Sequence, residues 1–375
     1  DFDDLIDAFD SDTLADTFSN YTGSEDAVIS ANLRGVEVVV TYPDNGGDIV
    51  VFEVPSLGIT EEFSEEDTRT ANEDDLVDFL EADENNVLSQ ILNAFVAQTP
   101  TDPVAGNPNS LQGQMGASDF GIGSSVGTDN SFQASGGTAT NAEGAPNLLG
   151  FGARFGRFSA DGVDTTVITL PLNYTIPLAD PRYAIIFDLP LTYAQTDDLD
   201  SYAASIGVGV RVPIFDNWYV TPSVRVGATG SLDLGSAAVL YSASVSSNFT
   251  VELGGLDWTL GNMVSYIATA PLDLPTGDFD AEYDLQNFVT RNGLEVSGGT
   301  GFELFGNPLT WELSAVNTQI FGDDVFIDNY TDVAFSLGTE ASENRLAWDS
   351  LRLGVTYTFA NEDYDGFRVN FGYKF

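Results

Sequence analysis

From residue 148 to residue 375, large apolar side chains alternate with polar or small ones at a period of two. Such alternation predicts β-strands, because successive side chains of a strand point to opposite faces of its sheet. Turn residues interrupt the pattern at regular spacing. We predict twelve strands, near 148–158, 164–177, 182–194, 201–214, 217–229, 237–251, 256–268, 287–304, 308–320, 328–339, 347–360 and 366–375.

The residue types on the two faces of these strands distinguish a membrane barrel from a soluble sandwich. One face carries apolar ladders such as Ile168, Leu170, Leu172 and Tyr174. The other face carries glycines and charges: Gly150, Gly152, Arg154, Asp188, Gly207, Gly209, Arg211, Arg225, Arg352, Gly354 and Arg368. A packed core would not accept unpaired charges, whereas the lumen of a barrel would. We therefore expect an all-β transmembrane antiparallel β-barrel of about 12 strands over residues 148–375.

The breaks between strands alternate in character along the chain. Tight turns such as 179–181 and 254–257 alternate with more acidic loops such as 194–200 and 269–284. Short connections on one side and longer ones on the other are typical of outer-membrane barrels. The stretch 339–349 is the exception, since it is long and falls on the expected short side.

The C-terminal ten residues, "GFRVNFGYKF", form an alternating strand that ends on an aromatic residue. This segment resembles the last strand of bacterial outer-membrane β-barrels, in which it acts as the assembly signal. The resemblance implies that Phe371, Tyr373 and Phe375 form that signal, and that the partners are outer-membrane lipid and the barrel assembly machinery. It also implies a location in the outer membrane of a Gram-negative bacterium. The start at Asp1 fits removal of a signal peptide.

Residues 1–98 form a separate, strongly acidic segment that we expect to be a small α+β domain. Its first ninety positions hold 25 acidic residues against Arg34 and Arg69. The run 35–54 indicates a hairpin across Asp44–Gly47. Helical spacing over 76–95 indicates a pair of amphipathic helices.

Residues 99–147 lose all periodicity and are rich in Gly, Ser, Asn and Thr. This composition predicts a flexible linker. An ordinary tether between domains is one interpretation, and a segment lodged in the barrel lumen is the other. A barrel with an extra N-terminal domain on a linker resembles autotransporter-type or small-porin barrels.

Composition excludes several function classes. The net charge of −46 repels nucleic acid. Without histidine or cysteine the chain lacks the usual nucleophile–base pairs and ordinary zinc sites, so we expect no enzyme and no catalytic residue. An acid-rich chain with one lysine suggests a halophilic surface from a saline habitat.

Charged residues on the small-residue face are the candidate pore-lining residues. These are Arg154, Asp188, Arg211, Arg225, Glu295, Glu312, Asp332, Arg352 and Arg368. The first, eleventh and twelfth strands become neighbours when the barrel closes, which brings Arg154, Arg352 and Arg368 to one wall. Arginines facing acids would create a transverse field that selects ions. The alternative is that these charges pair locally or bind the linker.

Cofactors are not expected, with one weak exception. The acidic alternation Asp278, Asp280, Glu282 and Asp284 offers carboxylates that Ca²⁺ accepts, but the spacing does not match a calcium loop. Solvated acidic loops are the favoured interpretation.

The sequence leaves the function open between three interpretations. The first is a pore, with cation preference if it conducts, because acidic mouths concentrate cations. The second is a translocator that passes the linker through its lumen and carries the acidic domain. The third is a structural or adhesive surface protein whose N-terminal domains self-associate or contact other cells. Outward-facing Ala228 and Ala243 would tolerate barrel contact in a homo-oligomer.

Overall fold

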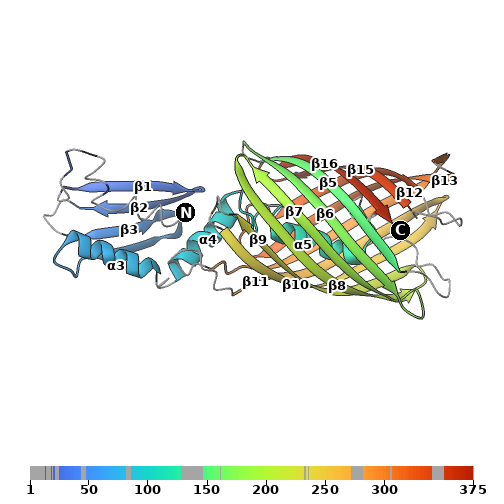
Figure 1. The fold of residues 1–375 in the computed structure, drawn as a ribbon, viewed down its shortest axis with the longest axis horizontal. Helices are drawn as coiled ribbons and strands as arrows, with labels where there is room; N and C mark the ends of the chain where they lie inside the picture. The colour runs from blue at the N-terminus through green and yellow to red at the C-terminus, as the bar shows by residue number, and fades with distance from the viewer. Residues whose placement is uncertain are drawn as a thin grey trace. The chain divides into compact units, whose positions relative to one another are not determined.

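The computed structural model describes residues 25–43, 48–81, 86–127, 147–160, 162–231, 236–271, 282–304, 306–339 and 350–374, together with positions 13, 18, 20, 21 and 234 (Figure 1). The chain divides into two compact units. The first is built mainly from residues 1–99, and the second from residues 100–232, 236–270 and 285–375.

The first unit contains a four-stranded antiparallel sheet in the order β1-β2-β3-β4. Its strands are β1 Ala27–Leu33, β2 Val36–Tyr42, β3 Val50–Val54 and β4 Ile59–Phe63, with the short 3₁₀ helix η1 Pro55–Leu57 before β4. The predicted pairing of the two β-branched runs is confirmed, since Val40 of β2 lies opposite Phe52 of β3. The predicted turn at residues 44–47 lies outside the described residues.

Two helices cover this sheet, α3 Arg69–Glu81 and α4 Val87–Gln98, which confirms the predicted helical spacing. Their apolar side chains Leu76, Leu80, Ile91 and Phe95 are buried. Helix α3 packs against β3 and β4, and α4 packs against β2, on which Val36, Val38 and Val40 are also buried. Burial of this face stabilises the unit, at roughly 25 cal/mol for each Å² of apolar surface removed from water.

The second unit is a closed antiparallel barrel of twelve strands. The strands are β5 Leu148–Ala160, β6 Val163–Pro177, β7 Ala184–Thr196, β8 Leu199–Phe215, β9 Trp218–Ser231, β10 Ser236–Leu253, β11 Leu256–Ala270, β12 Gln286–Leu304, β13 Asn307–Gly322, β14 Asn329–Thr339, β15 Ser350–Ala360 and β16 Asp365–Lys374. The barrel closes between β16 and β5, where Asn370 lies opposite Arg154. The predicted fold class and the number of strands are confirmed.

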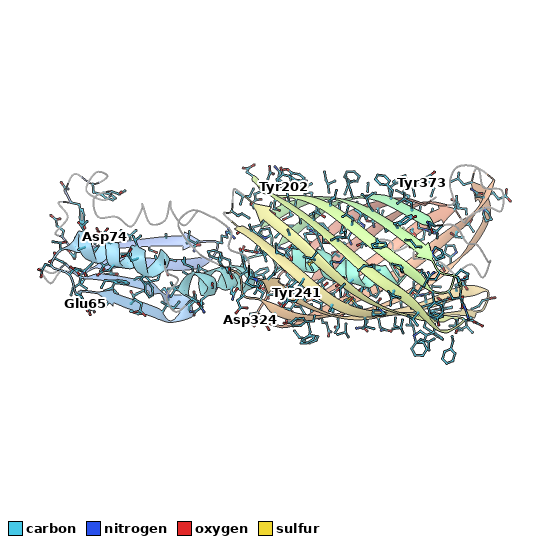
Figure 2. The ribbon with its side chains drawn as sticks, turned by 60° about the horizontal axis from the view of Figure 1, so that its bottom comes forward. Glu65, Asp74, Tyr202, Tyr241, Asp324 and Tyr373 are labelled. Carbon is cyan, nitrogen blue, oxygen red and sulfur yellow. The ribbon has the colours of Figure 1, made fainter. Side chains whose placement is uncertain are left out.

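The outer face of the barrel is apolar over its whole circumference. Large side chains such as Phe155, Val224 and Leu353 are more than half exposed there. Tyr202 and Tyr373 project from the outer surface (Figure 2). Exposed apolar surface of this extent needs a hydrocarbon environment, so the barrel is of the outer-membrane type. Among the described residues, every helix is too short or too polar to cross a membrane by itself.

Different parts of the chain lie at the two ends of the barrel. The end at which β5 begins and β16 ends is called the "terminal end", and it also carries the connections 178–183, 216–217 and 254–255. The opposite end, called "far end", carries the connections 197–198, 323–328 and 361–364. The expected loop at 194–200 is instead a tight turn, because β7 continues to Thr196 and β8 starts at Leu199. The long stretch 340–349 lies outside the described residues.

One helix, α5 Leu111–Gly123, lies inside the barrel (Figure 1). It packs against β7, β8, β9, β10, β11 and β12. Sequence reasoning missed this helix and predicted a flexible linker, because four glycines and a serine at positions 113, 116, 118, 121 and 123 weaken helix propensity. The surrounding wall supplies the missing stabilisation, since helices in proteins depend mainly on packing.

Candidate functional site: a plugged lumen

The candidate site is the lumen of the barrel together with the segment that fills it. We call residues 100–127 "the plug", with α5 as its central part. The helix begins after Ser110, whose hydroxyl accepts a hydrogen bond from Gly113 N at 3.3 Å, a typical N-cap. Before it, Asp102 Oδ1 accepts from Val104 N at 2.8 Å, and Asp102 is fully buried. The plug is therefore folded in its entry segment as well as in its helix.

The plug runs through the lumen from the far end to the terminal end. At the far end, Ile327 N donates to Gly106 O at 3.0 Å, and Asn109 Nδ2 donates to Tyr364 Oη at 2.8 Å. Further along, Ser125 N donates to Asn248 Oδ1 at 3.0 Å, close to the terminal end of β10. Residue 100 thus lies towards the far end, whereas β5 starts at the terminal end.

A buried charge cluster fixes the middle of the plug to the wall. Arg225 of β9 donates from Nε to Asp119 Oδ1 of α5 at 2.8 Å, and from Nη2 to Asp188 Oδ2 of β7 at 2.8 Å. Asp119 Oδ2 also accepts from Ser242 Oγ at 2.7 Å and from Ser265 Oγ at 2.9 Å. The charges are fully desolvated, and such pairs are tolerated only when their hydrogen bonds are satisfied, as they are here. The cluster therefore fixes the position of α5 along the barrel axis.

Wall glycines make room for the side chains of the plug. A Cβ added at Gly227 would lie 2.9 Å from Leu111 Cδ1, and one at Gly261 would lie 2.8 Å from Phe120 Cζ. Two further glycines receive plug side chains in the same way: Gly209 against Ile122 and Gly293 against Val126. Contacts this close leave no space for any larger residue on the wall. The lumen glycines therefore match the shape of the plug.

A second charged region lies on β12, β13, β14 and β15. Arg291 bonds Asp332 Oδ2 at 3.0 Å and lies 5.5 Å from the ring centre of Phe120 on the plug. Arg352 Nη1 lies 3.0 Å from Glu312 Oε1. Cation–π contact adds to the attraction between the arginine and the plug. Each of these two ion pairs thus joins strands that are separated by one intervening strand of the wall.

Glu295 of β12 holds the last described part of the plug. Its Oε2 accepts a hydrogen bond from Gly127 N at 3.0 Å, and its side chain is buried. The bond satisfies a backbone N–H that is buried inside the lumen, where an unmade hydrogen bond would be costly. The plug is therefore bonded to the wall at both ends and in the middle.

The opposite wall is less tightly packed against the plug. A cavity of ≈ 30 Å³ lies between plug residues that include Ser118 and wall residues that include Arg154, Thr169 and Arg368. This space is about the volume of one water molecule. Arg368 also lies 4.0 Å from Asp332 Oδ1. Of the three arginines expected on one wall, Arg154 and Arg368 share this cavity, whereas Arg352 turns to Glu312.

Arg211 lies near the terminal end of β8 instead of in the middle of the lumen. It stacks over the ring of Tyr219 at 5.6 Å, and its Nη2 donates to Pro181 O at 3.3 Å. Sequence reasoning also missed Asp119 and Arg291. The signal for Asp119 was its position as one of few acids in an otherwise uncharged linker.

The candidate assembly residues lie on β16. Phe371 is 38% exposed on the outer face and lies opposite Leu353 of β15 and Ala153 of β5. Tyr373 lies opposite Leu351 and Phe151. Phe375 lies outside the described residues. The two aromatic side chains therefore belong to the lipid-facing belt next to the seam at which the barrel closes.

The weak calcium candidates are only partly described. Asp278 and Asp280 lie outside the described residues, while Glu282 and Asp284 precede β12. Within the part of the chain that the structure describes, there is no group of three or more His, Cys, Asp or Glu residues that could hold a metal ion.

Comparison with known proteins adds structural likenesses but no sequence relative. No family model matches the chain, and no curated protein matches it significantly. The β domain of the Bordetella autotransporter BrkA is similar at a TM-score of 0.45 and 12% identity, over 61% of this chain and 99% of that one. The translocator domain of the autotransporter NalP from Neisseria meningitidis gives a TM-score of 0.43 and 10% identity, over 61% and 87%. The KdgM porin gives 0.35 and 9%, over 60% and 99%.

Proposed function

We propose that this chain is a translocator-type barrel that holds its own linker in the lumen and displays residues 1–98 at the cell surface. The observation that carries the proposal is the direction of the plug. Residue 100 lies towards the far end, and the chain then passes through the lumen before β5 begins at the terminal end. A domain that precedes residue 100 is therefore connected to the barrel through its far end.

The packing of the plug supports retention of the linker after passage. Asp119 is bound by Arg225, Ser242 and Ser265, and none of these four residues is exposed to solvent beyond a few per cent. A simple diffusion pore would gain nothing from such a fitted segment. A barrel that must stay closed while it carries a domain needs one, because an open lumen would let solutes leak across the membrane.

Single-cysteine labelling tests the display, and the cysteine-free chain makes it simple. The variants are Glu65→Cys in the first unit, Asp324→Cys at the far end and Asp216→Cys at the terminal end, all at exposed positions. Intact cells are treated with a membrane-impermeant maleimide. We expect labelling of the first two variants on intact cells, and of Asp216→Cys only after the outer membrane is opened.

Two outcomes contradict the proposal. Labelling of Asp324→Cys without Glu65→Cys on intact cells would show that the barrel is oriented as proposed but that the domain is not displayed. Labelling of Asp216→Cys on intact cells would show that the terminal end faces outward. Denaturing all three variants before labelling provides the control for reactivity of each cysteine.

We further propose cation preference for the lumen once the plug has left it. In the described part of the barrel, and apart from Arg211 near the terminal end, the wall then carries five arginines and four acids: Arg154, Arg225, Arg291, Arg352, Arg368, Asp188, Glu295, Glu312 and Asp332. These charges nearly cancel, so the charges at the two mouths decide the ion preference. Exposed acids lie at both mouths, such as Asp324 at the far end and Asp216 at the terminal end. Planar-bilayer recordings of a variant lacking residues 111–127 test this. A reversal potential that favours anions would contradict it.

We also propose that the acidic surface is an adaptation to high salt. With 58 acidic against 12 basic residues, self-repulsion destabilises the folded chain at low ionic strength. Added salt screens this repulsion over a Debye length of about 10 Å at 0.1 M. The unfolding temperature should therefore rise with NaCl concentration, and a temperature independent of salt would contradict the idea.

A further inference from the structure

Three asparagines lie side by side on the outer face of the barrel, within a surface that is otherwise apolar. Asn262 of β11 lies opposite Asn292 of β12, which in turn lies opposite Asn317 of β13. The chain neighbours of Asn292 face the plug, since Arg291 lies over the ring of Phe120 and a Cβ at position 293 would meet Val126. Side chains alternate along a strand, so Asn292 and the two amides beside it point away from the lumen. We call these three residues "the asparagine row".

The asparagine row lies at the depth of the hydrocarbon core. On β11, Trp258 and Tyr266 bracket Asn262 on the same face, and on β13, Trp311 and Phe321 bracket the third amide. Aromatic side chains at two levels of a membrane barrel mark its two interfaces with water. The segments 258–266 and 311–321 hold nine and eleven residues, which matches the length of about 9–11 residues that a tilted strand needs to cross the hydrocarbon. The amides are therefore placed where lipid would otherwise surround them.

The barrel satisfies these amides only in part. Asn262 Nδ2 donates to Asn292 Oδ1 at 2.7 Å, and Asn317 Nδ2 donates to Asn329 Oδ1 at 2.8 Å. Among the described residues, no hydrogen bond reaches Asn292 Nδ2 or the Oδ1 atoms of Asn262 and Asn317. Polar groups that face hydrocarbon without a partner are costly, because lipid tails cannot replace the hydrogen bonds of water. The row therefore presents unused donors and acceptors at a depth that lacks water.

The positions next to the row extend a surface that a second barrel can approach. Towards the far end, Thr290 of β12 lies opposite Gln319 of β13, which is exposed and adds another amide. Towards the terminal end, Leu294 lies opposite the small and exposed Ala315. Small side chains at such a surface allow two transmembrane segments to pack closely.

We propose that the asparagine row is the contact face of a homodimer within the membrane. Each amide both donates and accepts hydrogen bonds and the row is uncharged, so the row is complementary to the same row on a second copy. Amides that bond each other between transmembrane segments stabilise their association, whereas an acyl chain offers them no bond. Asn292 is the middle member of the row, so it lies nearest to the two-fold axis and bonds its counterpart in the second copy. The dimer does not depend on the side of the membrane to which the first unit is exposed.

Sedimentation equilibrium of the intact protein in density-matched detergent micelles tests the dimer. We expect the wild type to dimerise reversibly. Asn292→Leu with Asn317→Leu removes two amides while it keeps the size of the side chains, and it should raise the dissociation constant by roughly tenfold or more. The matched control is Thr166→Leu with Gln195→Leu, two exposed polar residues that lie opposite each other on β6 and β7. This control should dimerise like the wild type.

Three results would overturn the proposal. One is a wild type that stays monomeric at every protein concentration, and another is an equal dissociation constant for the two double variants. The third is lipopolysaccharide that remains on a monomeric wild type and is lost from the asparagine variant, which would make that lipid the occupant. Heat-dependent gel mobility checks that each barrel is folded.

A cross-link decides the question if the asparagine variant does not fold. Asn292→Cys in the cysteine-free chain should form a disulfide between two copies when isolated outer membranes are mildly oxidised. Val224→Cys is the control, since Val224 is 56% exposed on the outer face of β9, away from the row. Equal amounts of linked dimer for the two cysteines, or none for Asn292→Cys, would contradict the proposed contact face.

Discussion

Arg225 on the barrel wall and Asp119 on the plug form a 2.8 Å ion pair, and neither side chain is exposed to solvent. The two residues are separated by more than one hundred positions in the chain, and only the threading of residues 100–127 through the barrel brings them together. The pair links the part of the chain that must pass the membrane to the wall through which it passes. Its removal is the most specific way to weaken the plug.

Asp119→Asn should destabilise the protein by about 2–3 kcal/mol, because it takes one partner from a buried arginine while Asp188 still neutralises part of the charge. Urea unfolding of the purified barrel measures the change. Asp198→Asn is the control, since Asp198 is exposed in a turn and its replacement should alter stability by less than about 0.5 kcal/mol. Equal midpoints for the two variants would mean that Asp119 does not hold the plug.

Gly261→Leu should displace α5 from the lumen, because even a Cβ at this position would lie 2.8 Å from Phe120 Cζ. A cysteine at position 118 of the plug reports the displacement by its reaction with a small thiol reagent. Labelling should be slow with the wild-type wall and at least tenfold faster with Gly261→Leu. Gly299→Leu is the control, since a Cβ there would contact nothing within 4 Å. Equally slow labelling in both would show that the wall tolerates the larger side chain.

Replacement of Phe371, Tyr373 and Phe375 by serine should abolish insertion into the outer membrane. Phe371 and Tyr373 lie on the strand that closes the barrel, paired with β5 and β15. Loss of their apolar rings removes lipid-facing surface at the closing seam and the aromatic pattern of the C-terminal strand. Cell fractionation followed by heat-dependent gel mobility measures the outcome. Normal amounts of folded protein in the outer membrane would contradict the predicted role.

Tyr42 of the first unit should make folding sensitive to alkaline pH. Burial, followed by the neighbouring Glu73 carboxylate, raises the pKa of Tyr42 well above its ordinary value near 10. Near pH 10, the hydroxyl of Tyr42 therefore stays neutral in the folded state, whereas it ionises in the unfolded state. Its contribution to stability is complete below pH 10 and is lost as the pH rises towards the folded-state pKa.

The ultraviolet difference between wild type and Tyr42→Phe isolates this residue among the 14 tyrosines. Tyrosinate absorbance in the difference spectrum should appear only well above pH 10, together with unfolding of the first unit. Its appearance near pH 10 with the unit still folded would show that Tyr42 is not desolvated.

The barrel could be predicted from the sequence because its strands obey a local rule. Residues such as Phe155 and Arg154 alternate between lipid and lumen, and each strand carries its own evidence of that alternation. The closing of β16 on β5 followed from the number of strands. The predicted loop at 194–200 differs from the observed tight turn because acidic residues such as Asp197 and Asp198 are typical of loops. In the structure these two residues form a tight turn between long strands.

The plug could not be predicted in the same way, because its stability is not local. Residues 111–123 contain Gly113, Gly116, Gly121 and Gly123, which disfavour a helix in isolation. They form one because Gly209, Gly227, Gly261 and Gly293 of the wall leave space for the plug side chains. Glycines and arginines on the lumen face indicated that something fills the barrel, and residues 99–147 were one of the candidates, but no local pattern indicated a helix there.

The insertion of α5 into its own barrel is tested most directly by a designed disulfide. A Cβ at Gly116 would lie 3.9 Å from Val289 Cβ of β12, which suits a disulfide, and the chain has no other cysteine. Gly116→Cys with Val289→Cys should form the bond on mild oxidation and migrate differently on a non-reducing denaturing gel. Ser118→Cys with Val289→Cys, in which residue 118 faces the cavity beside Arg154, should not. If the first pair stays reduced, or both pairs cross-link equally, the plug does not lie in the lumen as described.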